Sequence, residues 1–380
     1  MRIRFHSIVH TTVLSALVAA AQTSFGAQTV TLGVAGPLTG GIAHLGKDME
    51  NGARLAIEEA NERGLIIGGQ KVIIRMDSQD DAGDPRTATQ VAQKLVDDRV
   101  VGIVGHLQSG TSIPASKIYR DAGIVEVSPS ATNPAYTLQG FNTTFRIVAT
   151  DAQQGPALAR YAAQTLKFKT IAIIDDSTAY GQGLADQFSA AAKALGVKVV
   201  SRDGTSDKTL DFKAILTRLK GLKPDAIMYG GTDAGGGPLA KQARALGLVT
   251  KIISGDGVCT DKLASLAGSA SETVICSEAS LPLEKMPGGQ DFKEKYRKRF
   301  GQDIQGFAPF AYDATNVIID AMRRANSVDP ARILGAMPAT RYQGVIGEIA
   351  FDKNGDVRQS AISIFTYREN KQVLLDLVRF

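Results

Sequence analysis

Segments typical of β-strands alternate with segments typical of α-helices along almost the whole chain. The apolar run at residues 30–35 predicts a strand, and apolar residues then recur at helical spacing over residues 47–63. Asp84-Pro85 supplies an N-cap and a first-turn proline for another helix. After Thr150 the pattern resumes, with strands and helices predicted in turn at residues 170–174, 184–195, 197–200, 211–220, 225–229 and 238–246. This alternation predicts an α/β protein built from two doubly wound parallel sheets.

The chain is long enough for two such units. At 380 residues, 44% of them hydrophobic, it exceeds the size at which a single core usually divides into domains. No linker rich in proline, glycine or serine separates the two halves. We therefore expect two lobes that share a hinge made of short crossovers.

The N-terminus has the layout of a secretory signal peptide. Arg2 and Arg4 precede an uncharged stretch at residues 8–21, and small and polar residues follow up to Ala27. A membrane-spanning helix needs roughly 20 apolar residues, and this stretch is shorter. We therefore predict that residues 1–27 are removed, that the mature chain begins at Gln28, and that the protein is periplasmic.

Charge and cysteine content exclude several kinds of partner. Without the predicted signal peptide the formal net charge falls from +5 to +3, and Lys and Arg are interleaved with Asp and Glu. The sequence has no cluster of basic residues of the kind that predicts nucleic-acid binding. The two cysteines, Cys259 and Cys276, are too few for a thiolate metal site. In an oxidising compartment we expect a disulfide between them, and otherwise two small buried packing residues.

Catalytic motifs are scarce. After residue 27 the only histidines are His44 and His106, and neither a G-x-S-x-G elbow nor an H-E-x-x-H motif is present. Residues 41–47 match G-x-x-x-x-G-K, but Asp48 stands where a phosphate-binding loop has Ser or Thr, and a carboxylate there would repel phosphates. We expect no catalytic residue, no metal and no cofactor. An exported hydrolase with paired carboxylates remains the alternative.

Four loops that follow predicted strands are candidate binding segments. Ligands of open parallel sheets bind beyond the carboxyl ends of the strands. Residues 105–111 and 128–134 are rich in hydroxyls and small residues, which can receive a carboxylate, although such residues also serve as ordinary turns and caps. Tyr180 and Asp256 lie in two loops of the second half, where a ring could cover a ligand and a carboxylate could receive an ammonium group.

Taken together, these segments resemble the leucine/isoleucine/valine-binding proteins of bacterial branched-chain amino-acid importers. The matching segments run in order along nearly the whole chain: residues 30–40, 80–85, 105–107, 128–132, 180–183 and 229–231. The resemblance implies a type I periplasmic binding protein fold whose chain crosses between the lobes three times. It implies a first lobe of residues 28–150 and 281–360, and a second lobe of residues 151–280 and 361–380.

The resemblance also implies roles for individual residues. Ser109 and Thr132 resemble residues that hold a ligand carboxylate through hydroxyl and backbone N–H groups. The Ser130 carbonyl and the Thr132 hydroxyl resemble groups placed for the α-ammonium, with Ala131 between these two residues. Tyr180 and Asp256 resemble the residues of the second lobe that complete the site, with Asp256 pairing with the ammonium.

Side-chain selectivity is less clearly implied. Leu45 and Thr232 occupy positions where the family commonly has an aromatic residue, and Phe307 falls near a pocket aromatic. The positions of a first-lobe disulfide found in some members are here Gly83 and Gln108, so that bridge is not expected.

The function implied is capture of a small L-amino acid, above all leucine, isoleucine or valine, by lobe closure and its delivery to the permease subunits of an ABC importer. We expect the protein to be a monomer. Another small amino acid, an amide or a urea-like solute is the alternative ligand. A sensor would need a membrane span and a repressor a DNA-binding segment, and neither is visible in the sequence.

Overall fold

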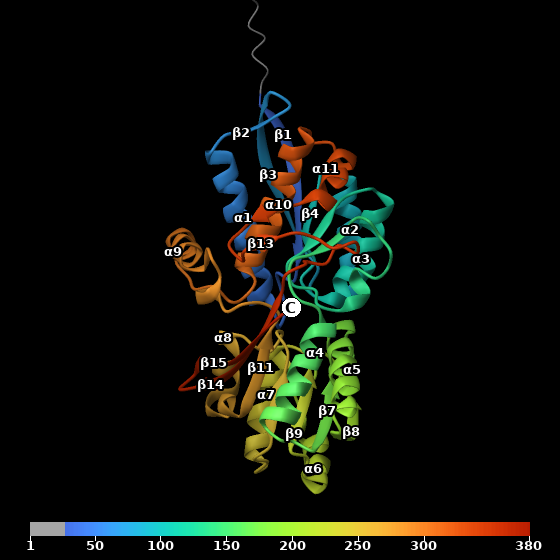
Figure 1. Ribbon diagram of the computed structural model, residues 1–380, viewed down its shortest axis with the longest axis vertical. Coiled ribbons are helices and arrows are strands. Elements are labelled where there is room, and N and C mark those ends of the chain that lie inside the picture. The colour runs from blue at the N-terminus through green and yellow to red at the C-terminus, as the bar shows by residue number, and fades with distance from the viewer. Residues whose placement is uncertain (1–26) are drawn as a thin grey trace, which may run out of the picture.

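Two β-sheets, one in each of two stacked lobes, organise the computed structural model (Figure 1). The structure describes residues 27–380, so the predicted signal peptide lies almost entirely outside the described residues. No helix in the described part of the chain is long and apolar enough to cross a membrane.

The first sheet has six strands in the order β2-β3-β1-β4-β5-β6. Its strands are β1 (Gln28–Gly36), β2 (Leu65–Ile67), β3 (Gln70–Asp80), β4 (Ile103–Gly105), β5 (Glu126–Ser128) and β6 (Thr144–Arg146). All neighbours pair in parallel except β2, which pairs antiparallel with β3. The helices that follow its strands are α1 (Ala43–Glu62), α2 (Pro85–Asp97) and α3 (Ser109–Asp121). The Asp84 carboxylate caps α2 by accepting from the backbone N–H groups of Arg86 and Thr87, as predicted.

The second sheet has seven strands in the order β15-β14-β11-β10-β9-β7-β8. Its strands are β7 (Thr170–Asp175), β8 (Lys198–Gly204), β9 (Ala226–Gly230), β10 (Lys251–Ser254), β11 (Val274–Glu278), β14 (Ala361–Arg368) and β15 (Lys371–Arg379). The helices of this lobe are α4 (Asp151–Arg160), α5 (Ala179–Ala194), α6 (Lys213–Leu222), α7 (Asp233–Ala245) and α8 (Asp261–Ala267), and a π-helical turn at Tyr161–Thr165 extends α4. The hairpin β14–β15 is antiparallel, and the remaining strands run parallel.

The chain returns to the first lobe after β11. The returning segment contains α9 (Gly289–Phe300), α10 (Ala308–Ala325), α11 (Pro330–Ala336), β12 (Tyr342–Gln343) and β13 (Glu348–Ile349). Helix α10 packs against α1 in the core of the first lobe. Gly52 of α1 permits this close approach, because a Cβ atom there would lie 2.1 Å from the carbonyl oxygen of Ala308.

The chain therefore passes between the lobes three times, between β6 and α4, between β11 and α9, and between β13 and β14 (Figure 1). Hydrogen bonds tie the three passages together. The backbone N–H of Ala149 donates to the carbonyl of Ala279 over 2.9 Å, and the Ser363 hydroxyl donates to the carbonyl of Ser280 over 2.6 Å. These hydrogen bonds show that the three passages lie side by side. The predicted α/β fold, with crossovers that share a hinge, is confirmed.

Two details differ from or complete the prediction. Helices α5 and α7 begin about five residues before the predicted starts, because Thr178 and Thr232 precede first turns made of small and polar residues that carry no helical apolar pattern. Cys259 and Cys276 form a disulfide that joins the segment after β10 to β11, with Cα atoms 5.3 Å apart. The predicted bridge is therefore present.

Candidate functional site

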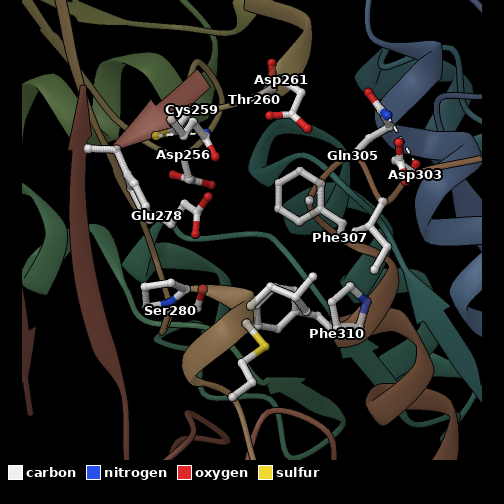
Figure 2. Close-up of a pocket in the computed structure, with 18 of the residues that line it drawn as sticks. Asp256, Cys259, Thr260, Asp261, Glu278, Ser280, Asp303, Gln305, Phe307 and Phe310 are labelled. Carbon is white, nitrogen blue, oxygen red and sulfur yellow. Dashed lines mark hydrogen bonds between the residues drawn. The ribbon is translucent and has the colours of Figure 1, made fainter. Parts of the chain in front are cut away.

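A cavity of about 620 Å³ lies between the two lobes, next to the second chain passage. Its wall is made mainly by residues 256–261, 278–286, 303–310 and 370–372, together with Ser130 and Val148. Figure 2 shows Asp256 and Glu278 on one side of this cavity and Phe307 and Phe310 on the other. The volume is in the range of small-molecule sites, which span about 300–1,000 Å³.

Asp256 is held rigidly at the wall of the cavity. The loop after β10 carries it, and its side chain is 9% exposed. Its Oδ1 atom accepts from Gln154 Nε2 over 2.7 Å and from the Tyr180 hydroxyl over 3.0 Å. Tyr180 in turn accepts from the backbone N–H of Gly257 over 2.9 Å. Burial raises the pKa of Asp256, and the bonds from Gln154 and Tyr180 oppose that rise.

The second oxygen of Asp256 has no such support. Among the described residues, no other residue donates a hydrogen bond to Oδ2. A buried carboxylate with one oxygen fixed and one unpartnered at a cavity wall can receive a cationic donor at little cost in reorganisation.

Glu278, at the end of β11, is the second carboxylate of the same wall. Burial raises its pKa to about 8, and the nearby carboxylates of Glu284, Asp261 and Asp256 add to the rise. No described residue hydrogen-bonds its carboxyl group, which borders the cavity. Glu278 was not predicted as a site residue, because nothing in the local sequence of β11 distinguishes it from any other glutamate at the end of a strand.

The opposite wall is largely apolar and rests on the start of α10. Phe307 precedes this helix, and its backbone N–H, with that of Ala308, donates to Asp48 Oδ2 over 2.8 Å in each case. The Tyr296 hydroxyl donates to Asp48 Oδ1. Asp48 thus anchors a helix N-terminus, which explains why a carboxylate follows the G-x-x-x-x-G-K sequence.

The loop after β5 brings its predicted ligand-binding residues close together, but only Ser130 lines the cavity. The Ser130 hydroxyl donates to the carbonyl of Leu107 over 2.6 Å, and Ser109 Oγ accepts from the backbone N–H of Asn133 over 3.1 Å. Thr132 Oγ1 is buried and has no hydrogen-bond partner among the described residues. It lies close enough to Asp151 to lower the pKa of that carboxyl group, and the Ser109 O–H also donates to no described residue, so both hydroxyls can bind a ligand.

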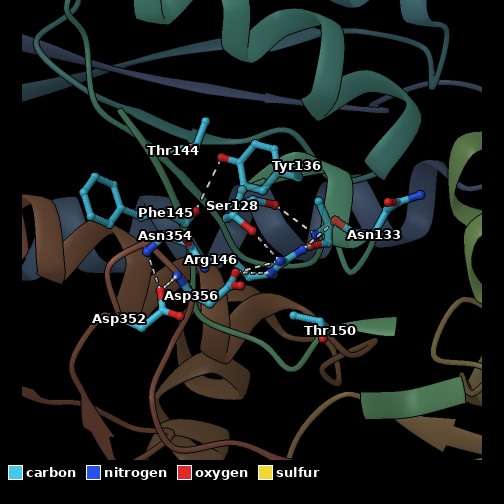
Figure 3. Close-up of polar contacts among 12 residues, drawn as sticks. Ser128, Asn133, Tyr136, Thr144, Phe145, Arg146, Thr150, Asp352, Asn354 and Asp356 are labelled. Carbon is cyan, nitrogen blue, oxygen red and sulfur yellow. Dashed lines mark hydrogen bonds and ion pairs between the residues drawn. The ribbon is translucent and has the colours of Figure 1, made fainter. Parts of the chain in front are cut away.

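Arg146 holds this loop in place, as Figure 3 shows. Its guanidinium is fully buried and donates through Nη1 to the carbonyls of Ala131 and Asn133, over 2.9 and 2.8 Å. It also donates to Thr137 Oγ1 and, through Nε and Nη2, to Asp356 Oδ1. Arg146 was not predicted from the sequence; the signal available was a lone arginine at the end of β6, between Phe145 and the apolar residues 147–149.

A further contact joins the lobes beside the cavity. His44 Nε2 lies 2.8 Å from Asp233 Oδ2, and this carboxylate also accepts from the Thr260 hydroxyl over 2.6 Å. His44 belongs to α1 in the first lobe and Asp233 to α7 in the second, so this hydrogen bond holds the closed arrangement of the two lobes.

The predicted site residues fall into two groups. Ser130, Asp256 and Phe307 line the cavity, and Tyr180 supports Asp256 from behind. The others that do not line it are Ser109, Ala131, Thr132, Leu45 and Thr232. Leu45 is buried in the core of the first lobe, and Thr232 is the N-cap residue of α7. Their part in ligand binding stays a prediction.

Two α/β lobes, linked by three chain passages and closed over one cavity, define a bilobal solute-binding protein. A family model described as periplasmic binding protein matches residues 29–372. The chain belongs to this family. It is a family of solute-binding proteins and not an enzyme family.

Individual relatives agree with this assignment. An amino acid binding protein of Pseudomonas aeruginosa is 36% identical over 341 residues, which cover 89% of this chain and 90% of the relative. A Leu/Ile/Val-binding protein homologue of Brucella suis is 35% identical, with coverage of 91% and 93%. The crystal structure of a leucine binding protein from Thermotoga maritima superposes with a TM-score of 0.85 at 27% identity, covering 92% of this chain and 98% of that one. The type I fold and the family resemblance seen in the loops are confirmed.

Proposed function

We propose that this protein is the solute-binding component of an ABC importer and that it captures an L-amino acid, above all leucine, isoleucine or valine, between its two lobes. The observation that carries the proposal is Asp256, a buried carboxylate at the cavity wall with one oxygen fixed by Gln154 and Tyr180 and the other unpartnered among the described residues. The relatives, which are named as amino-acid-binding, Leu/Ile/Val-binding and leucine-binding proteins, support the same ligand class.

In this proposal the first lobe receives the carboxylate and the second lobe receives the ammonium. Thr132 Oγ1, which is buried without a partner among the described residues, and Ser109 Oγ are the proposed hydroxyls for the ligand carboxylate. Asp256 pairs with the ammonium. The proposed lobe limits are residues 28–150 with 281–360, and 151–280 with 361–380. The permease is the proposed membrane partner, and the binding protein acts as a monomer.

Calorimetry of ligand-stripped protein tests the ligand class. L-leucine should bind, whereas 4-methylpentanoate, which lacks the ammonium group, should bind far more weakly because Asp256 would then stay buried without a cation. Equal binding of both compounds would contradict the pairing of Asp256 with the ammonium group. A preference for acetamide or urea over leucine would assign the protein to the amide-type alternative.

Two further measurements test how the proposed protein works. Small-angle scattering should give a smaller radius of gyration with leucine than without, because the site is completed only when the lobes meet. N-terminal sequencing of protein from the periplasm should start at Gln28 or within one residue of it. An unchanged radius at saturation would contradict closure, and an intact Met1 would contradict removal of residues 1–27.

A further inference from the structure

The carboxylate of Asp256 has a second carboxylate beside it. Glu278 borders the same cavity, and Figure 2 shows both side chains on one wall. One α-ammonium group can pair with Asp256, and this leaves Glu278 without a partner among the described residues. Of the carboxyl groups that line the cavity, Asp256 and Glu278 are the two that are not exposed, whereas Asp261, Glu284 and Asp303 are exposed. Two carboxyl groups away from solvent exceed what a ligand with a single ammonium group requires.

The charges that act on Glu278 are all negative. Glu284, Asp261 and Asp256 raise its pKa, and no cation opposes them. The cationic side chains at the cavity are Lys293, Arg297 and Lys371, and all three are exposed at its rim. The inner part of the acidic wall therefore lacks a counter-charge from the described chain.

The facing wall suits an aliphatic chain. Phe307 and Phe310 lie across the cavity from Glu278 (Figure 2), and Met286 lines it as well. Methylene groups pack against such a surface, while a terminal ammonium stays with a polar partner, as lysine side chains do at protein surfaces. The cavity therefore offers an apolar face for a chain and a carboxylate for its end.

We propose that Glu278 makes the site favour an L-amino acid with a cationic side chain, such as lysine or ornithine, over a neutral amino acid of the same length. The proposal rests on the proposed function, in which Asp256 receives the α-ammonium. Glu278 then receives the side-chain ammonium, while the methylene chain packs against Phe307 and Phe310. Aliphatic amino acids occupy the same cavity without this second ion pair.

Proton release gives the proposal a distinctive signature. With a pKa of about 8, Glu278 is mostly protonated at neutral pH in the ligand-free protein. An ammonium group beside it favours the ionised form, so binding lysine expels a proton. A neutral side chain leaves Glu278 protonated and expels none from it.

L-lysine and L-norleucine are the decisive pair, because they share a chain and differ in the terminal ammonium. In calorimetry at neutral pH the unaltered protein should bind lysine about tenfold or more tighter than norleucine, as expected for one charge-assisted hydrogen bond in a partly buried site. Titration in two buffers of different ionisation enthalpy should show proton release with lysine only.

Glu278→Gln should abolish both the preference and the proton release, while norleucine affinity stays within about threefold because the shape is kept. Glu294→Gln is the matched control: this exposed residue of α9 does not line the cavity and should leave the preference and the proton release intact. Thermal unfolding of both variants verifies that they fold.

Each remaining outcome is informative. Equal affinity for lysine and norleucine in the unaltered protein, or an undiminished preference in Glu278→Gln, would overturn the role of Glu278 while leaving amino-acid binding in place. If lysine, norleucine and leucine all fail to bind, the proposed function itself fails, and this inference with it.

Discussion

The two walls of the cavity satisfy their polar groups in different ways. On the first-lobe side, the Ser130 hydroxyl donates to the carbonyl of Leu107. Behind this wall, Ser109 accepts from the backbone of Asn133, and Arg146 holds the loop that carries Ala131. On the second-lobe side, Asp256 and Glu278 keep carboxylate oxygens that no described residue contacts. The first-lobe side is stabilised by its own hydrogen bonds. On the second-lobe side, burial and neighbouring carboxyl groups disfavour the ionised forms of Asp256 and Glu278, and a cationic ligand would favour them. Changes in the first wall should therefore reduce stability, and changes in the second should reduce affinity.

Removal of Arg146 should have the largest effect. Arg146→Met leaves the carbonyls of Ala131 and Asn133 buried without a donor and breaks the pair with Asp356, which should lower the free energy of unfolding by about 3–5 kcal/mol. Urea unfolding followed by circular dichroism measures it, since the chain has no tryptophan. Asp356→Asn keeps the guanidinium in place and should cost less. A loss below about 1 kcal/mol for Arg146→Met would show that the loop does not depend on it.

A neutral residue in place of Asp256 should have the opposite pattern, with a loss of leucine affinity and no loss of stability. Asp256→Asn can still accept from Gln154 and Tyr180, so the fold should be as stable as before or more stable, while leucine affinity should fall about 10- to 100-fold. Leu45→Ala is the contrasting variant: because Leu45 is buried in the core, it should lose about 2–5 kcal/mol of stability and change leucine affinity less. Unchanged leucine binding by Asp256→Asn would contradict the assignment of the ammonium site.

Stability should fall as pH rises, because burial raises the pKa of several carboxyl groups in both lobes, among them Asp313 of α10 to about 7 and Asp176 after β7 to about 6. Burial raises the pKa of Glu278 to about 8 and that of Asp151, at the start of α4, to about 7. Between the unfolded and folded pKa values the native state binds more protons than the unfolded state, so the free energy of unfolding decreases with pH. Stability from these groups is therefore fully present below about pH 4 and is lost as pH rises through about 7 to 8.

Denaturation at several pH values between about 5.5 and 8 tests this sign. Glu278→Gln removes one of several titrating groups, which include Asp151, Asp313 and Asp176, and should make the decrease less steep without abolishing it. A flat profile in the unaltered protein would show that these carboxyl groups do not have raised pKa values in the folded state.

Loss of the hydrogen bond between His44 and Asp233, which joins the two lobes, should give the smallest effect. His44→Ala removes the hydrogen bond to Asp233 and should weaken leucine binding by roughly three- to tenfold, because about 0.5–1.5 kcal/mol of support for the closed form is lost. Calorimetry with leucine measures the change. Equal affinity of variant and parent would mean that closure depends on the ligand and the hinge alone.

The fold was predictable from the sequence because the strand and helix periods are local. Asp84-Pro85 marked the start of α2, and the apolar run at residues 30–35 marked β1. The starts of α5 and α7 were not predictable, since their first turns contain glycines and polar residues whose helical state depends on tertiary packing. Gly235, for example, lies against Tyr229, where a Cβ atom would come within 2.2 Å of the tyrosine oxygen.

The site was predictable only in part. Asp256 follows a strand and stands between glycines, so its position at the carboxyl edge of the sheet could be inferred. Glu278 and Arg146 could not, because their importance comes from neighbours distant in the sequence: Glu278 from the loop at Asp256, and Arg146 from Asp356. Contacts between residues that are distant in the sequence produce no periodic pattern in a single sequence.

The order in which the lobes are completed has a consequence for synthesis. Helix α10 packs on α1, although about 260 residues separate them, and β14 pairs with β11, with Phe365 opposite Cys276. A chain that emerges N-terminal end first therefore has neither a finished first core nor a protected edge on β11 until its last fifth is available. Such long-range closure delays folding until the whole polypeptide exists.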